Sequence, residues 1–119
     1  LLREKILTAY ASNGLTPPNL KDVLDPLGLE FKEAAPVFKL LQEQGELLKI
    51  KEDMYFHAPA IADLKARVAA FFAANEEMGP VEFKDIANLS RKYAIPLMEF
   101  MDKEKFTVRV GDKRRLRKA

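Results

Sequence analysis

The sequence contains no cysteine, and its only histidine is His57. Without cysteine the chain can form neither a disulfide scaffold nor a thiolate metal site, and one histidine is too few for a histidine-based zinc or iron centre. No apolar run approaches the roughly 18 residues that a membrane-spanning helix needs. These absences exclude most metal chemistry, and we expect no metal, no cofactor and no membrane partner.

Motifs for catalysis are absent as well. The sequence has no P-loop, no Gly-x-Gly-x-x-Gly fingerprint and no nucleophile elbow. His57 falls at the end of a predicted strand, and acidic pairs such as Glu52-Asp53 and Glu76-Glu77 fall at turns or helix ends, where solvated charges are common. Because no set of residues forms a catalytic site, we predict a binding module and not an enzyme.

What remains is the composition of a small globular protein, with 119 residues, 48% of them hydrophobic and 32% charged. This length suits one ordinary domain or two very small ones. The chain opens at Leu1 without an initiator methionine and without a signal-like leader. We therefore expect an internal or C-terminal fragment of a larger protein, and the lack of cysteine suggests a reducing compartment.

An internal repeat organises the chain. The segment Leu20–Val23 recurs as Phe83–Ile86, and Ala35–Leu41 matches Ile95–Met101 at an offset of 60 residues. Apolar positions, two prolines and the turn positions agree in order between the copies. The sequence therefore predicts two modules, one over residues 1–58 and one over residues 59–119.

Each module has the same predicted order of three helices and a two-stranded hairpin. In the first module these are a helix through Leu2 and Tyr10, a short helix from Leu20, a helix over about Phe31–Gln44, and strands Leu47–Lys51 and Met54–His57. In the second they are Ala60–Glu77, Phe83–Leu89, Arg91–Lys105, Phe106–Val110 and Lys113–Leu116. The predicted fold class is mostly α with small β-hairpins, as two tandem winged helix-turn-helix modules.

Charge is divided unequally between the modules. Residues 1–59 carry seven Lys and Arg against nine Asp and Glu, whereas residues 60–119 carry thirteen against nine. Within residues 109–119, six basic residues including Lys118 accompany a single acid, Asp112. This asymmetry predicts a polyanionic partner for the second module.

The second module has basic residues at the two places that a winged helix presents to a nucleic acid. Its third helix begins Ser90-Arg91-Lys92-Tyr93, where Ser90 is a good N-cap and the first amides of the helix can bind a phosphate. If Val108 and Val110 of the hairpin point inward, Arg115 and Arg117 project outward. The predicted nucleic-acid-binding residues are Lys84, Ser90, Arg91, Lys92, Tyr93, Arg109, Lys113, Arg114, Arg115 and Arg117.

The first module lacks this basic surface. Glu30 and Glu33 stand at the start of its third helix, and Glu52 and Asp53 form its hairpin turn. The two modules are therefore predicted to share the fold but not the basic surface. This difference favours a spacer or docking role for the first module.

Pro96 allows two interpretations of the second module's third helix. The helix either starts at Ser90 and continues through the proline, at a cost of roughly 3 kcal/mol for an interior proline, or begins at Pro96. Both modules retain this proline, so we favour the longer helix with a local distortion.

Past Tyr93 the same helix is mostly apolar and offers few side chains that could read bases in a DNA major groove. A compact target such as an RNA hairpin loop or bulge fits this limited surface better. Two alternatives remain open at this point, a DNA-binding transcription regulator and a protein-docking winged-helix module.

Three motifs resemble the C-terminal region of the bacterial selenocysteine-specific elongation factor (SelB) family. They are Phe83-Lys84-Asp85, Ser90-Arg91-Lys92-Tyr93-Ala94-Ile95-Pro96-Leu97, and Arg109-Val110-Gly111-Asp112-Lys113-Arg114. The resemblance implies that the second module binds the selenocysteine insertion (SECIS) hairpin of an mRNA beside an in-frame UGA codon, using the basic residues for phosphates and extruded loop bases. It also implies that the chain acts in translation in the cytoplasm, that the ribosome is a further candidate partner, and that the chain is a monomer. The GTPase domain of the family lies outside this sequence.

Overall fold

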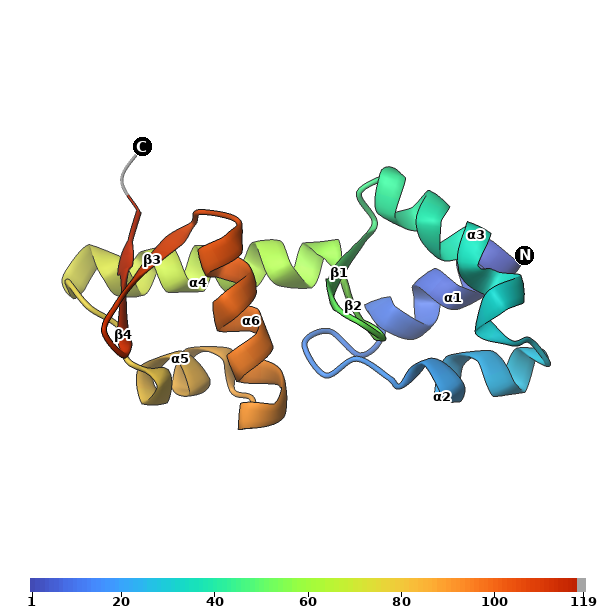
Figure 1. Cartoon of the computed structure of the whole chain (residues 1–119), viewed down its shortest axis with the longest axis horizontal. Coiled ribbons are helices and arrows are strands. Elements are labelled where there is room, and N and C mark those ends of the chain that lie inside the picture. Colours follow the sequence, from blue (N-terminus) through green and yellow to red (C-terminus); the bar gives the residue numbers. More distant parts are fainter. Residues whose placement is uncertain (118–119) are drawn as a thin grey trace. The chain divides into compact units, whose positions relative to one another are not determined.

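The computed structural model describes residues 1–117, which group into two compact units, Leu1–Ile61 and the residues from Ala62 onward. Each unit contains helices and one antiparallel two-stranded hairpin, in the predicted order (Figure 1). Among the described residues, no helix is long and apolar enough to cross a membrane.

The first unit is built from three α-helices, a short 3₁₀ turn and a hairpin. In chain order these are α1 (Leu2–Ala11), α2 (Leu20–Leu24), the 3₁₀ turn η1 (Asp25–Leu27), α3 (Phe31–Glu43), β1 (Leu47–Lys51) and β2 (Met54–His57). The two strands have the predicted bounds because alternating apolar residues and a tight turn define them clearly.

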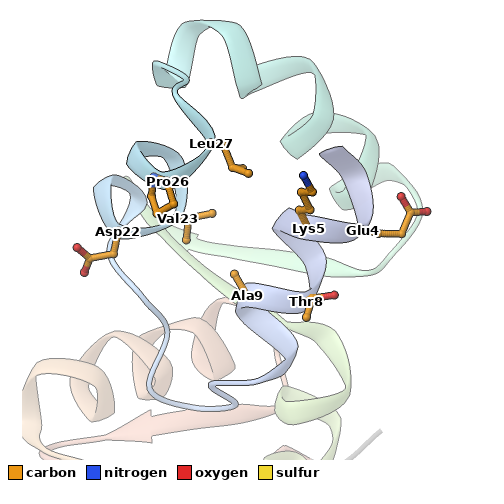
Figure 2. Close-up of a pocket in the computed structure, with 8 residues that line it drawn as sticks. All are labelled: Glu4, Lys5, Thr8, Ala9, Asp22, Val23, Pro26 and Leu27. Carbon is orange, nitrogen blue, oxygen red and sulfur yellow. The ribbon is translucent and has the colours of Figure 1, made fainter. Parts of the chain in front are cut away.

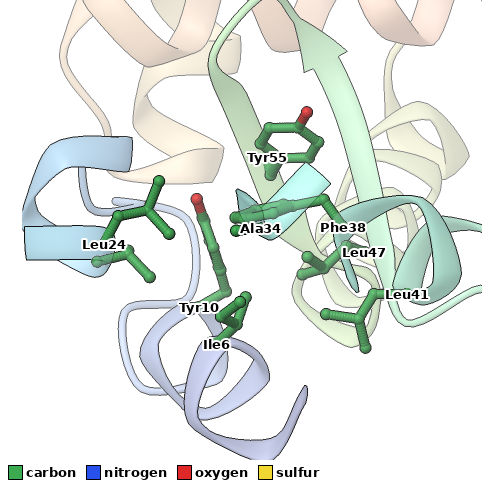
Figure 3. Packing of buried hydrophobic residues seen from close by; sticks show 9 residues of the cluster. Ile6, Tyr10, Leu24, Ala34, Phe38, Leu41, Leu47 and Tyr55 are labelled. Carbon is green, nitrogen blue, oxygen red and sulfur yellow. The ribbon is translucent and has the colours of Figure 1, made fainter. Parts of the chain in front are cut away.

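An aromatic cluster holds the first unit together (Figure 3). Tyr10 of α1 packs edge-on against Phe38 of α3, with ring centroids 6.0 Å apart, and Phe38 lies 4.8 Å from Tyr55 of β2. The three rings therefore hold α1, α3 and the hairpin strand β2 together. The hydroxyl of Tyr10 is buried without a hydrogen-bond partner among the described residues.

The second group of elements comprises α4 (Ala58–Ala74), α5 (Pro80–Ala87), α6 (Arg91–Lys103), β3 (Thr107–Val110) and β4 (Lys113–Leu116). The boundary between the units falls within α4. This helix ends earlier than predicted, and the Asn75 side chain donates a hydrogen bond of 2.9 Å to the Phe71 carbonyl in its last turn. Below, the β3–β4 hairpin is called the wing.

Helix α5 begins at Pro80, three residues before the predicted start. Proline suits the first position of a helix because that position needs no N–H donor. The Glu82 carboxylate then accepts a hydrogen bond of 2.7 Å from the Gly79 N–H, which closes the first turn. A left-handed Asn88, with φ of 56°, ends the helix.

Helix α6 begins at Arg91 and continues through Pro96, which confirms the longer of the two predicted helices. Helix α3 contains Pro36 in the same way. The N–H that Pro96 lacks would have bonded to the carbonyl of Lys92, four residues earlier. Since Lys92 lies exposed in the first turn, water can satisfy that carbonyl and the helix is not broken.

The wing packs with the opposite face from the one predicted. Val108 is paired with Arg115, and both Val108 and Val110 are exposed, at 42% and 47% of their surface. The inward positions are instead Thr107 and Arg114, at 2% and 6% exposure. The prediction that both valines point inward is therefore wrong, because two hydrophilic residues with a half-buried partner occupy the core side of the hairpin.

That partner is Asp102, near the end of α6. Its Oδ1 accepts a hydrogen bond of 2.6 Å from the Thr107 hydroxyl. Its Oδ2 accepts from Nε and Nη2 of Arg114, at 3.1 Å and 2.9 Å. Both buried hydrophilic residues are thus satisfied by one carboxylate, as burial of a charge requires.

Candidate nucleic-acid interface

The start of α6 is open to solvent and positively charged. Ser90 is the N-cap, and within residues 1–117 no side chain hydrogen-bonds to the first amides of this helix. Arg91 and Lys92 are exposed beside those amides, and the Lys92 Nζ lies 5.3 Å from the centroid of the half-buried Tyr93 ring. Free amides, the helix dipole and two cations together make a favourable site for a phosphate.

The corresponding start of α3 in the first unit is closed by an acid. The Glu33 carboxylate accepts a hydrogen bond of 3.0 Å from the Glu30 N–H. In α6 the residue at the matching position, at an offset of 60, is Tyr93. Of these two equivalent helices, α3 has a carboxylate in its first turn and α6 has none.

A recess of ≈ 400 Å³ lies between α5, α6 and the wing. It brings together four of the predicted residues, Lys84 of α5, Arg91 of α6, Arg109 of β3 and Arg114 of β4. The other residues that line it are Pro80, Val81, Ala94, Ile95, Met98 and Glu99. Cations around a largely apolar floor match a nucleotide, which has a phosphate and a flat, weakly hydrated base.

Arg109 is held in place within the wing. Its Nε donates a hydrogen bond of 2.8 Å to the Gly111 carbonyl at the turn. Its partner across the hairpin is Arg114, so the two side chains lie on the same face of the wing, the one toward the recess. The guanidinium of Arg109 remains exposed on this face.

Arg114 requires a correction to the predicted set. Its side chain is only 7% exposed and forms a salt bridge of 2.9 Å with Asp102. Its backbone N–H and carbonyl also form a bridge with Met78, at 2.9 Å and 2.8 Å. Because its charge is neutralised and buried, Arg114 supports the wing and does not offer a free cation to a ligand.

The remaining basic residues of the wing lie on its outer face. Lys113 and Arg115 are paired across the hairpin with the exposed Val110 and Val108. Arg115 also contacts Glu77, with 3.3 Å between Nη2 and Oε2, in a partly exposed ion pair of small energetic weight. The predicted basic surface is thus divided by the hairpin into a recess side and an outer side.

Arg117 follows the wing, and its N–H donates a hydrogen bond of 3.1 Å to the Phe106 carbonyl. This bond continues the ladder beyond Leu116, so by alternation Arg117 lies on the same outer face as Arg115. Lys118, which belongs to the same basic run in the sequence, lies outside the described residues.

The first unit also has a pocket, but in a different place (Figure 2). It lies between α1 and the α2–η1 segment, away from the start of α3 and the hairpin, and is lined by Glu4, Lys5, Thr8, Ala9, Asp22, Val23, Pro26 and Leu27. Its two carboxylates and single amine do not form a basic site. The recess of the second unit therefore has no counterpart in this pocket.

Comparison with known proteins supports the resemblance seen in the sequence. Residues 70–116 match a family described as elongation factor SelB, winged helix. The chain is 46% identical over 117 residues to the selenocysteine-specific elongation factor of Desulfomicrobium baculatum. The match covers 98% of this chain and 18% of that relative, so the chain spans under a fifth of the relative's length.

Two solved structures share the fold. The mRNA-binding domain of elongation factor SelB from E. coli, solved in complex with SECIS RNA, has a TM-score of 0.82 at 22% identity, with 98% of both chains covered. A crystal structure of bacterial selenocysteine-specific elongation factor EF-Sec has a TM-score of 0.74 at 20% identity, with 98% of this chain and 18% of that chain covered. These likenesses confirm the predicted mostly helical, doubly winged fold. The match of residues 70–116 and the 46% identity to the Desulfomicrobium baculatum factor identify the chain as a winged-helix fragment of the SelB type.

Proposed function

We propose that this chain binds an RNA hairpin through its second unit, and that the hairpin is the SECIS element of an mRNA beside an in-frame UGA codon. The observation that carries the proposal is the recess, where Lys84, Arg91 and Arg109 surround an apolar floor. The E. coli SelB domain of the same fold is complexed with SECIS RNA, which supports this choice of ligand. Binding would tether the elongation factor at the codon that it decodes.

In this proposal, different residues around the recess bind the phosphates and the base of the RNA. The α6 amides after Ser90, with Arg91 and Lys92, bind a phosphate at the helix start. The apolar floor receives an unstacked loop base, while Lys84 and Arg109 neutralise the phosphates on either side of it. On the outer face of the wing, the exposed Lys113, Arg115 and Arg117 meet flanking phosphates of the stem.

RNA fits this surface better than a DNA duplex. Beyond its first turn, α6 buries Ala94, Leu97 and Met98 in the unit's core. A helix that reads a major groove needs several polar side chains along its exposed face. Here sequence-specific contacts are limited to one turn of α6 and the wing, which suits the splayed bases of a hairpin loop.

The unequal charge of the two modules also suggests different roles for them. We assign residues 1–58 a spacer or docking role, with the ribosome as a candidate partner, because their α3 start and hairpin turn carry acids. We assign residues 59–119 the RNA contact, and we assign the chain a binding role with no catalytic step. GTP binding belongs to other parts of the parent factor, which acts in translation in the cytoplasm, and we expect the chain to be a monomer.

The direct test is a fluorescence-anisotropy titration of the full chain with a SECIS-type hairpin. The competitors are the same stem with a replaced loop and a duplex DNA of equal length. The expected result is selective binding of the hairpin, with an affinity that falls about tenfold or more in Arg91→Ala, the loss of one charge-assisted contact. Equal binding of all three ligands would instead indicate non-specific electrostatic attraction.

The duplication supplies a matched control. Lys92 and Lys32 are exposed lysines at equivalent positions of α6 and α3, at an offset of 60. Lys92→Ala should weaken RNA binding, whereas Lys32→Ala should leave it unchanged. If both variants weaken binding equally, the RNA does not distinguish the two units and the proposal is wrong.

A further inference from the structure

The second unit contains a polar cluster, two of whose three members are buried, that the RNA-binding proposal does not use. Its members are Asp102 of α6, Thr107 of β3 and Arg114 of β4, linked by hydrogen bonds of 2.6 Å, 2.9 Å and 3.1 Å. Thr107 and Arg114 are the only polar or charged side chains classed as buried among the described residues. Desolvating an ion pair of this kind costs free energy, so packing alone does not explain why the unit contains it.

The first unit shows that the fold itself does not need the cluster. At an offset of 60, Gln42 and Leu47 stand at the positions of Asp102 and Thr107. Tyr55 takes the position of Arg114, because it is the register partner of Lys49 as Arg114 is of Arg109. Leu47 and Tyr55 are buried with no ion pair and join the aromatic core. The same architecture therefore closes with an apolar contact in one unit and with a charged contact in the other.

We propose that Asp102 is a positioning residue for RNA binding, which fixes the wing against α6 so that Arg109 stands across the recess from Arg91. The inference rests on the proposed function and extends it to a residue outside the RNA-contacting set. The unit that carries the cluster is also the unit that carries the recess.

The geometry indicates how the effect is transmitted. Two hydrogen bonds from a planar guanidinium fix the orientation of Arg114 more tightly than an apolar contact would. Arg114 also bridges to Met78 through its backbone, so Asp102, β4 and the segment before α5 are held together. Arg109 is directly opposite Arg114 in the hairpin, and its position on the recess follows that of Arg114.

A double-mutant cycle in the full chain tests this inference. Hairpin-RNA affinity is measured for wild type, Asp102→Asn, Arg109→Ala and the double variant, with thermal unfolding recorded for each. Asp102→Asn should weaken binding by about tenfold, and Arg109→Ala should then cost less than about threefold in that background, because residues that act as one unit are non-additive. Lys92→Ala, located on α6 and not on the wing, should cost the same factor in both backgrounds.

A second pair of variants covers the case in which Asp102→Asn does not fold. Thr107→Ser keeps the hydroxyl that donates a hydrogen bond to Asp102. Thr107→Val keeps the shape of the threonine side chain but removes this donor. Serine should preserve both the RNA affinity and the contribution of Arg109, and valine should reduce both. A purely structural role would lower the unfolding temperature and leave the Arg109 contribution intact.

The outcomes separate the two proposals. If the wild-type chain does not bind the hairpin, the proposed function fails and this inference fails with it. If wild type binds, but the folded Asp102 or Thr107 variants bind equally well or lose affinity additively with Arg109→Ala, only the positioning role is overturned.

Discussion

Gly45 and Lys105 occupy the same position in the two units, and both have left-handed backbone, with φ of 74° and 64°. Each follows the helix that precedes a hairpin, and each helix closes with the same pair of hydrogen bonds. The N–H of Gly45 bonds to Gln42 and that of Lys105 to Asp102, while the next N–H reaches Leu41 in one unit and Met101 in the other. This is the Schellman motif, which favours glycine at the left-handed position.

Lys105→Gly should therefore stabilise the second unit. A left-handed backbone costs a residue with a Cβ about 1–2 kcal/mol, and glycine avoids that cost while losing some entropy, so we expect a net gain of up to about 1 kcal/mol in the free energy of unfolding. Urea unfolding measures the change. Gly45→Ala is the reverse substitution in the first unit and should lower stability by a similar amount; a loss of stability in Lys105→Gly would contradict the argument.

Tyr10→Phe should raise the stability of the first unit at neutral pH. The Tyr10 hydroxyl is buried without a partner among the described residues, and an unsatisfied buried polar group costs about 1–3 kcal/mol. The substitution keeps the ring contacts with Phe38 and Tyr55. We expect a gain of about 1 kcal/mol in thermal or urea unfolding, while Tyr93→Phe in the second unit controls for the loss of a hydroxyl elsewhere.

The same tyrosine should make the first unit sensitive to alkaline pH. Burial is the main cause that raises the pKa of Tyr10 far above its ordinary value of 10.0, and the nearby Tyr55 adds to it. The unfolded chain then loses this proton at a lower pH than the folded chain. Stability is complete below about pH 10 and falls as the pH rises above it. Unfolding followed from pH 9 to 12 should show a smaller decline in Tyr10→Phe than in wild type.

Much of this fold can be predicted from the sequence, because local signals define it. The hairpin Leu47–Lys51 and Met54–His57 follows from alternation and a tight turn, and the recess residues Lys84, Arg91 and Arg109 follow from their places in the repeat. The apolar pattern places the start of α5 at Phe83 and not at Pro80, because proline can end a helix as well as occupy its first position.

The face of the wing could not be predicted in the same way. Val108 and Val110 are more apolar than Thr107 and Arg114, so hydropathy alone predicts that the valine face of the hairpin is buried. The structure buries the opposite face. The correct face depends on Asp102, which lies in α6 outside the hairpin and appears in the sequence as one acid among several. A comparison of the two copies could have indicated the buried face, since Gln42 and Leu47 replace Asp102 and Thr107 in the first unit.

RNA binding should depend steeply on salt concentration. If the cations around the recess and on the outer face of the wing contact about four to six phosphates, the log–log slope of affinity against salt should be about −3 to −5. Arg91→Ala should reduce the magnitude of this slope by about 0.7–0.9, the contribution of one phosphate. A slope near zero would indicate that the cations do not contact the RNA backbone and would favour a protein partner instead.

Tyr93→Glu should weaken RNA binding by giving α6 the acid that closes α3. Glu33 bonds to the Glu30 N–H at the start of α3, and Tyr93 stands at the equivalent third position after Ser90. A glutamate there would complete a Ser-x-x-Glu capping box, which strengthens the helix start but puts a negative charge where the phosphate binds.

Tyr93→Gln separates the charge from the loss of the aromatic ring, because glutamine can also cap the helix while remaining neutral. We expect the glutamate variant to bind the hairpin about tenfold more weakly than the glutamine variant, with both variants folded. The difference between them should shrink at high salt, since screening weakens exposed charge repulsion. Equal affinities for the two variants at low salt would mean that no phosphate binds at the start of α6.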